Sequence, residues 1–330
     1  MTLVTLDFET PYELKKNPES ELSKFSLKTM TYEEYIFDRR FDIFGASIKI
    51  NDEPTRWYDE GLKAKLHELF YPGNNSILLA HNTIFDGAIL SWYYGLHAQT
   101  YWDTQGMSNA LWPQYSASLK ALAKRLFPND DSMHKGDGLE QVAGLWPSEL
   151  SDELWNILRT YGVQDADVTF ACFKALYPYF PKKELEVLSA TLRMFIEPAF
   201  ILDQDRVKNY HAELTKAKKE LVDASGLAES TLASNDKFAA YVERQHGIKI
   251  PRVMSPTKKN PDNTKLALSK NDLEFIQIRK ENPDLHALWD ARINVKSTGE
   301  INRAQRLLQH VQPKTGAIAV PLKYCAAHTG

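Results

Sequence analysis

The chain has 330 residues, of which 43% are hydrophobic and 25% are charged. This composition is ordinary for a globular protein of about two domains and excludes an intrinsically disordered chain. The formal net charge of −3 gives no whole-chain argument for nucleic-acid binding, so charge has to be considered region by region. The sequence does not begin with a basic segment followed by an apolar one, as a secretory leader would, and no segment approaches about 18 consecutive apolar residues. We therefore expect a cytoplasmic protein that does not contact membranes.

The two cysteines, Cys172 and Cys325, are too few for a disulfide framework and match no zinc-binding spacing. This usage favours a reducing, intracellular setting. We expect both thiols to be inert packing groups.

Strand-like patterns dominate the first 100 residues. The five strand candidates are residues 3–8, 43–50, 55–58, 77–80 and 99–102. The helical patterns between and after them are residues 61–70, 83–94, 119–127 and 152–176. This arrangement predicts an α/β domain, a sheet flanked by helices, that ends near residue 185.

After about residue 185 the strand signals nearly vanish. Apolar residues from Val207 to Ala224 recur at alternating steps of three and four, which predicts a long amphipathic helix, and helical patterning returns over residues 272–310. Between them, residues 247–270 carry six lysines and arginines and the single acid Asp262, a local charge of +5. We therefore expect a mostly α-helical second domain over residues 186–330.

The first candidate site pairs Asp7 with Glu9 at the end of the opening strand. Residues two apart in a strand point to the same face, so these carboxylates can share a cation. The pair alone is a weak signal, because the same spacing recurs at Asp272 and Glu274 in a helical stretch, where it indicates a solvated surface.

The second candidate is Asp86, one helical turn after Asn82, where an apolar strand runs into a helix. On the alternative interpretation, Asn82 or Thr83 caps the helix and Asp86 only complements the helix dipole.

The third candidate places Tyr161 and Asp165 four residues apart on one helix face. A surface Tyr/Asp pair is the alternative. Gly162 lies between them, and a glycine in mid-helix costs about 1 kcal/mol relative to alanine, so a close approach by substrate or by another backbone is a plausible compensation.

The three patterns together are much more specific than each alone, because N-x-x-x-D and Y-x-x-x-D each occur once, in that order and in suitable contexts. Four acids brought together without cations would repel one another, whereas two divalent ions would satisfy their charge. The combination therefore indicates a metal site.

Over residues 1 to about 180 the sequence resembles the DEDDy 3′→5′ exonucleases of the ribonuclease H-like superfamily, in particular the proofreading domain of family A (polymerase I-like) DNA polymerases. The resemblance is carried by residues 6–10, 82–86 and 161–167, with support from residues 102–104 and 118–123. Phe85 departs from the tyrosine that cellular relatives often carry. Residues 11–40 resemble phage-type enzymes more than cellular ones, so the expected location is the host cytoplasm if a phage encodes the chain.

This resemblance implies a ribonuclease H-like mixed sheet and two cations, Mg²⁺ or Mn²⁺. It implies that Asp7, Glu9 and Asp165 hold one ion, and that Asp7 and, partly through water, Asp86 hold the other. Tyr161 would orient the attacking water, and the product would be a nucleoside 5′-monophosphate. Phe8, Asn82 and Phe85 would adjoin the terminal nucleotide of a single-stranded DNA 3′ end, although buried packing is an equal alternative for either phenylalanine.

The second half resembles the thumb of a family A polymerase, which grips duplex DNA by its backbone. Lys258, Lys259 and Lys296 are its expected DNA contacts, with a solvated loop as the alternative for the basic segment. Residues 322–330 resemble the stretch that precedes the polymerase palm, so we expect an N-terminal part of a polymerase, whether truncated or one half of a split gene, that cannot polymerise nucleotides alone. The missing polymerase half is an expected partner.

Two other functions stay open. The fragment could be a catalytically idle module that binds DNA or a partner, although the presence of all four acids and the tyrosine argues against it. An RNA-trimming exoribonuclease of the same superfamily is disfavoured by the polymerase-like second half.

Overall fold

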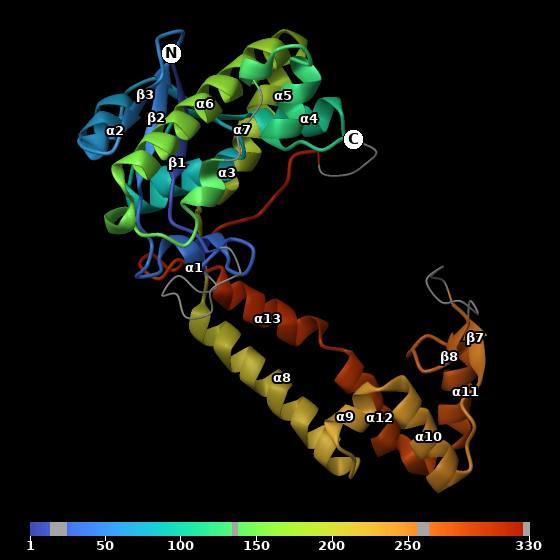
Figure 1. Cartoon of the computed structure of the whole chain (residues 1–330). Helices are drawn as coiled ribbons and strands as arrows, with labels where there is room; N and C mark the ends of the chain where they lie inside the picture. Colours follow the sequence, from blue (N-terminus) through green and yellow to red (C-terminus); the bar gives the residue numbers. More distant parts are fainter. Residues whose placement is uncertain (14–24, 134–137, 256–263, 326–330) are drawn as a thin grey trace. The chain divides into compact units, whose positions relative to one another are not determined.

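The computed structural model describes residues 1–13, 25–133, 138–255 and 264–325 (Figure 1). Its contacts divide the chain into unit 1, residues Met1–Leu202 with Gln309–Gly330, and unit 2, residues Asp203–Leu308. The expected boundary near residue 185 falls instead inside helix α7 (Lys182–Ile196). The division differs because α7 buries Leu185, Leu188 and Leu192 in the core of unit 1.

Unit 1 is built on a mixed five-stranded sheet, with the strand order β3-β2-β1-β4-β5. Strand β2 runs antiparallel to β1, and β3 runs antiparallel to β2. On the other side of β1, β4 runs parallel to β1 and β5 runs parallel to β4. The strands are β1 (Thr2–Glu9), β2 (Gly45–Ile50), β3 (Arg56–Tyr58), β4 (Ser76–Ala80) and β5 (Thr100–Asp103). All five predicted strands and the α/β class are thus confirmed, while the ribonuclease H-like assignment stays a prediction.

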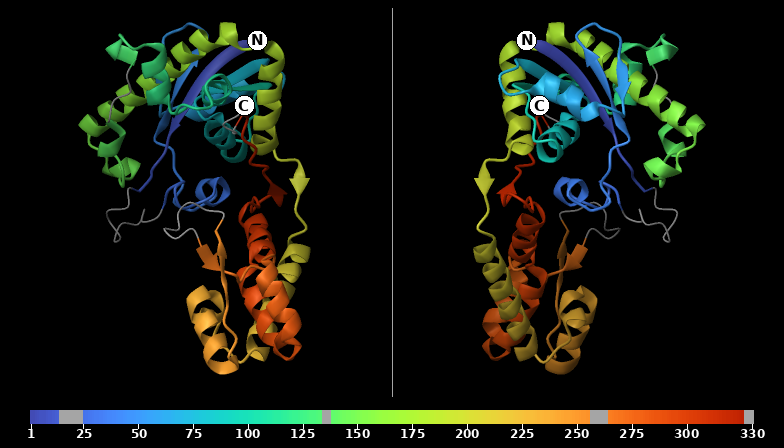
Figure 2. Two further views of the ribbon diagram at one scale, coloured as in Figure 1. Left: turned by 90° about the vertical axis from the view of Figure 1, so that its right-hand side faces the viewer. Right: turned by 90° about the vertical axis from the view of Figure 1, so that its left-hand side faces the viewer.

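Helices cover both faces of this sheet, and Figure 2 shows the sheet between α6 on one side and α3 with α7 on the other. The helices of unit 1 are α1 (Tyr32–Ile36), α2 (Leu62–Phe70), α3 (Thr83–Ala88), α4 (Thr104–Leu111), α5 (Leu119–Leu126), α6 (Asp152–Leu176) and α7. Four of them match predicted helices. The helix expected over residues 83–94 changes after α3 into a π-helix, Ile89–Tyr93, and α1, α4 and α7 were not expected.

The core of unit 1 lies between the sheet and these helices. Val4 and Leu6 of β1 and Leu78 and Leu79 of β4 are at most 1% exposed. Full burial of one such side chain contributes about 1.5–3 kcal/mol, so these side chains hold the two parallel strands firmly in the core. The returning chain joins this unit through the small sheet of β6 (Phe200–Ile201) and β9 (Ala317–Ile318).

Unit 2 is mostly helical, as predicted (Figure 1). Its helices are α8 (Gln204–Ala224), α9 (Glu229–Ala233), α10 (Asn235–His246), α11 (Leu273–Glu281), α12 (His286–Lys296) and α13 (Gly299–Gln309). They enclose a separate core in which Trp289 makes edge contacts with Phe238 and Phe275, at centroid distances of 6.1 and 5.8 Å. The basic segment holds a hairpin that was not expected, formed by β7 (Arg252–Met254) and β8 (Thr264–Leu266).

Among the helices in the described part of the chain, none combines the length and the apolar character needed to cross a membrane.

Candidate active site

A pocket of about 420 Å³ opens in unit 1 where the end of β1 meets α3 and the middle of α6. Its lining includes all five residues predicted to be catalytic: Asp7, Glu9, Asp86, Tyr161 and Asp165. These residues come from three segments that are up to 158 positions apart in the sequence. The fold therefore brings the predicted set together.

Strand β1 supplies Asp7 and Glu9. Their neighbours on β2 are Ser47 and Gly45, respectively. A Cβ at Gly45 would lie 2.4 Å from the Trp57 ring and 2.7 Å from the carbonyl oxygen of Tyr58, so only glycine fits beside Glu9. This close packing fixes the end of β1 from which both carboxylates reach the pocket.

Helix α3 supplies Asp86, which is only 2% exposed. Its Oδ1 accepts a hydrogen bond of 2.9 Å from the backbone N–H of Phe8, so Asp86 is joined to β1 and does more than complement the helix dipole. Burial raises the pKa of Asp86 to about 7. A cation near this carboxylate would stabilise its charged form.

Asp103, at the end of β5, holds the turn that leads into α3. Its Oδ1 accepts from the backbone N–H groups of Asn82 at 2.8 Å and Gln105 at 3.1 Å, and its Oδ2 accepts from Gly106 at 3.1 Å. Asn82 has φ of 69° and makes no side-chain cap bond, so its side chain does not cap α3. The bonds of Asp103 to Gln105 and Gly106 cap α4, and its bond to the Asn82 amide ties this cap to the start of α3. Asp103 belongs to residues 102–104, which supported the family resemblance, but its capping role was not predicted, although an aspartate that directly precedes a helix is a recognisable capping signal.

Helix α6 supplies Tyr161 and Asp165, and Gly162 lets this helix lie close to the sheet. A Cβ at Gly162 would lie 3.0 Å from Ser47 Oγ and 3.0 Å from the Trp57 ring. The close approach that the mid-helix glycine suggested is therefore made by side chains of β2 and β3. It brings the buried Tyr161 and Asp165 up to the end of β1.

The pocket is strongly negative around the phenol. Burial raises the pKa of Tyr161, and the charge of Asp165 raises it further, followed by smaller contributions from Glu9 and Asp7. The Tyr161 hydroxyl also hydrogen-bonds the Asp165 carboxylate. The four groups thus interact electrostatically within one site.

The three predicted neighbours of the terminal nucleotide are placed differently. Phe85 is half-buried and lines the pocket. Phe8 also lines it, but is only 4% exposed and stacks on Tyr94 at 5.9 Å, so it is mainly a core side chain. Asn82 lines a separate cavity of about 400 Å³ in unit 1, where its side chain hydrogen-bonds Tyr32.

A segment that sequence reasoning did not assign to the site, residues 26–28, also lines the pocket. It is anchored by Phe25, which is fully buried and stacks on Tyr35 at 4.4 Å. The Tyr35 hydroxyl in turn donates to the carbonyl of Pro11 at 2.6 Å, close to the end of β1. Lys28, which is exposed, is the one lysine or arginine among the described residues of the lining.

The carboxylates fit a hard divalent cation by their chemistry, because oxygen donors are the ligands that Mg²⁺ and Mn²⁺ prefer. Their positions fit less well. Within the described ranges, no group of three or more histidine, cysteine, aspartate or glutamate side chains is placed so that it could hold an ion.

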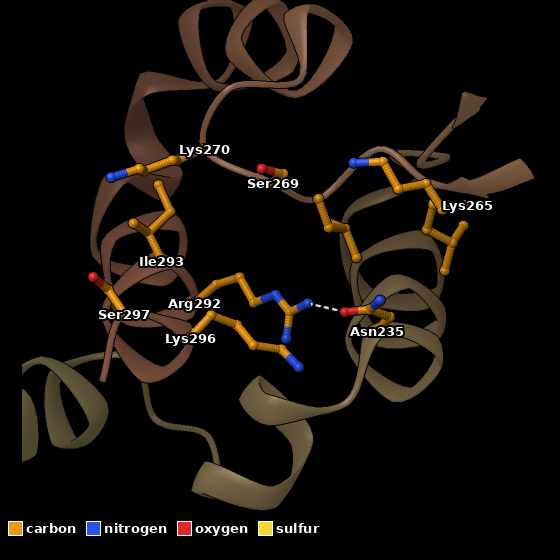
Figure 3. Close-up of a pocket in the computed structure, with 10 residues that line it drawn as sticks. Asn235, Lys265, Ser269, Lys270, Arg292, Ile293, Lys296 and Ser297 are labelled. Carbon is orange, nitrogen blue, oxygen red and sulfur yellow. Dashed lines mark hydrogen bonds between the residues drawn. The ribbon is translucent and has the colours of Figure 1, made fainter. Parts of the chain in front are cut away.

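The predicted DNA contacts of the second half are only partly described. Lys258 and Lys259 lie outside the described residues. Lys296 lines a pocket of unit 2 (Figure 3).

No protein-family model matches the chain, and no curated protein matches it. Among solved structures, it is similar to the POL domain of Pol1 from M. smegmatis in complex with DNA primer-template and dNTP, with 17% identity and a TM-score of 0.49 over 84% of this chain and 46% of that one. This chain thus spans less than half of that polymerase chain. It is also similar to Brucella melitensis NrnC with bound Mg²⁺, with 16% identity and a TM-score of 0.36 over 58% of this chain and 81% of that one. These similarities are too distant to assign the chain to a family.

Proposed function

We propose that unit 1 is a metal-dependent 3′→5′ exonuclease that removes nucleoside 5′-monophosphates from DNA ends. The observation that carries this proposal is the meeting of Asp7, Glu9, Asp86, Tyr161 and Asp165 in one pocket. The proposed role of the chain is that of the proofreading part of a phage-type family A polymerase, with a ribonuclease H-like first domain and a thumb that holds duplex DNA.

In this proposal Asp7, Glu9, Asp86 and Asp165 hold two cations, Mg²⁺ or Mn²⁺. Such a pair supplies activation of a water and stabilisation of the charge that develops on the phosphate. Asp86 is fixed by its bond to the Phe8 amide, which places this carboxylate beside the end of β1.

The other groups of the pocket bind the substrate and orient the attacking water. A tyrosine hydroxyl is protonated at neutral pH, so Tyr161 positions the attacking water by a hydrogen bond and does not act as its base. The half-buried ring of Phe85 offers a face on which the terminal base can stack. Lys28 at the exposed side of the pocket suits the charge of the phosphate.

A catalytically idle DNA-binding module is the second candidate. An idle pocket would bind a DNA 3′ end and leave it intact.

The test is a time course with DNA and RNA oligonucleotides of one sequence, labelled at the 5′ end, in Mg²⁺ and in EDTA. We expect stepwise shortening of the DNA from its 3′ end in Mg²⁺ only, and none with Asp7→Ala. Intact DNA would support the idle module, and preferential shortening of RNA an exoribonuclease. Internal cuts, or full activity of Asp7→Ala, would contradict the proposal.

A further inference from the structure

Helix α1 supports the end of the strand that carries Glu9. Its Tyr35 lines the carboxylate pocket and is only 1% exposed. The Tyr35 hydroxyl donates to the carbonyl of Pro11 at 2.6 Å and lies 2.8 Å from Oγ1 of Thr10. Because a tyrosine hydroxyl has one hydrogen, which Pro11 accepts, the Thr10 hydroxyl is the donor in the second bond. Tyr35 is thus bonded to the two residues that directly follow Glu9.

The position of Glu9 depends on supports from two sides. On the sheet side, β1 ends at Glu9, and the backbone N–H of Phe44 donates to the Glu9 carbonyl at 2.9 Å. Beyond Glu9 the chain leaves the sheet, and the Tyr35 hydroxyl holds the next two residues. A shift of α1 would therefore move the backbone at one of the four acids of the pocket.

Helix α1 also carries a buried acid, Glu33, which is 2% exposed. Its Oε2 lies 3.2 Å from Nδ1 of His310, and since an ionised carboxylate can only accept, Nδ1 carries the hydrogen. The two residues are 277 positions apart, and both belong to unit 1. Oε1 of Glu33 is buried and has no hydrogen-bond partner in the part of the chain that the structure describes. Loss of His310 would therefore leave a buried charge without compensation, which is strongly unfavourable.

His310 stands directly before a well-ordered turn. Val311 forms a bridge with Ile318 of β9, and the backbone N–H of Gln312 donates to the carbonyl of Ala317 at 2.8 Å. Strand β9 in turn pairs with β6. These bonds fix the backbone that follows His310, so its imidazole can hold α1 in place through Glu33.

We propose that His310, which does not line the carboxylate pocket, is a positioning residue for it. His310 holds α1 through Glu33, and α1 holds the end of β1 through Tyr35. The catalytic consequence of this link rests on the exonuclease function proposed above. The link itself can be measured without cleavage.

The link is tested by amide hydrogen exchange of the full chain. In His310→Gln we expect the amides of α1 and the amide of Phe44, which reports on the Glu9 carbonyl, to exchange at least about tenfold faster. His67→Gln changes an exposed histidine of α2 in the same unit, and this matched control should exchange like wild type. The double variant Glu33→Gln/His310→Gln also removes the buried charge, so it should exchange more slowly than His310→Gln alone.

The catalytic consequence is tested by the kinetics of the same variants on labelled DNA. We expect His310→Gln to lower kcat about tenfold, because a small displacement of catalytic groups by a distant substitution can cost up to about 100-fold. KM should stay nearly unchanged, since Glu9 is a proposed metal ligand and not a nucleotide contact. The double variant should regain most of the lost kcat, and His67→Gln should keep wild-type kinetics.

The outcomes separate this proposal from the exonuclease function. Unchanged exchange in α1 would overturn the proposal whatever the nuclease activity. Faster exchange in α1 with an unchanged Phe44 amide would overturn it too, because α1 would then not hold β1, as would an unchanged kcat in an active enzyme. If wild type left DNA intact, the exonuclease function would fail, and the exchange at Phe44 would still decide whether His310 positions the end of β1.

Discussion

Asp165 and Asp167 stand two residues apart on α6, but they serve different parts of the molecule. Asp165 is buried and lines the carboxylate pocket. Asp167 accepts hydrogen bonds from Lys49 Nζ at 3.0 Å and from Thr55 Oγ1 at 2.6 Å, and so ties α6 to the β2–β3 hairpin. The two acids therefore form a matched pair of variants for testing the proposed catalytic role of Asp165 against the structural role of Asp167.

We expect Asp165→Asn to lower exonuclease activity by more than the roughly 10- to 100-fold that loss of an outer-shell partner of a metal site costs. Asp167→Asn should lose at most about 1 kcal/mol of unfolding free energy, because its ion pair is partly exposed, and should keep nearly full activity. Initial rates on labelled DNA and urea unfolding of both variants measure this. Equal losses of activity in the two variants would contradict the different roles given to Asp165 and Asp167.

Gly45 fixes the position of Glu9, its partner across β1 and β2. We expect Gly45→Ala to cost about 1–3 kcal/mol of unfolding free energy, because the new methyl group would meet the Trp57 ring and the Tyr58 carbonyl. Gly299→Ala is the control, since the nearest atom to a Cβ there is 3.9 Å away. If urea unfolding showed that Gly45→Ala is as stable as wild type, the hairpin would be less constrained than its packing indicates.

Lys28 is expected to bind the substrate phosphate from the exposed side of the pocket. Lys28→Gln should raise KM about three- to tenfold, a loss of up to about 1.4 kcal/mol, and lower kcat much less. Lys28→Arg keeps the charge and should restore most of the affinity. A variant that changed kcat alone would place Lys28 outside substrate binding.

The two cysteines should differ in reactivity, whereas the sequence led us to expect two inert thiols. Burial raises the pKa of the Cys172 thiol to about 12, so this group stays neutral and protected at pH 8, whereas Cys325 is half-buried. A thiol reagent at pH 8 should therefore modify one cysteine per native chain and the second only after unfolding. Rapid modification of both, or modification of Cys172 in a Cys325→Ser variant, would show that the core around α6 opens readily.

The strands and the catalytic candidates could be predicted because local patterns carry them. Alternating apolar and polar residues indicate β1. Residues two apart in a strand, such as Asp7 and Glu9, or four apart in a helix, such as Tyr161 and Asp165, lie on the same face, and Asp86 follows Asn82 by one helical turn. Gly162 also signalled a close approach, although the sequence could not say which side chains would make it.

The missed features depend on contacts between distant segments. The π-helix after α3 shares the apolar pattern of an α-helix, so residues 83–94 looked like one element. The boundary near residue 185 was misplaced because α7 packs on unit 1, and Lys28 reaches the pocket only through the stacking of Phe25 on Tyr35. Arginine side chains are usually exposed, so the sequence did not indicate that Arg292 is buried; its burial follows from the fold.

The proposed exonuclease function depends most on the claim that the pocket of Asp7, Glu9, Asp86 and Asp165 holds a pair of divalent cations. Electron paramagnetic resonance of a Mn²⁺ titration, with a single-stranded DNA that carries an uncleavable 3′ end, counts the bound ions directly. We predict two Mn²⁺ ions per wild-type chain that are both lost or strongly weakened in a variant with Asp7→Ala. Wild-type binding no greater than that of the variant would contradict the claim.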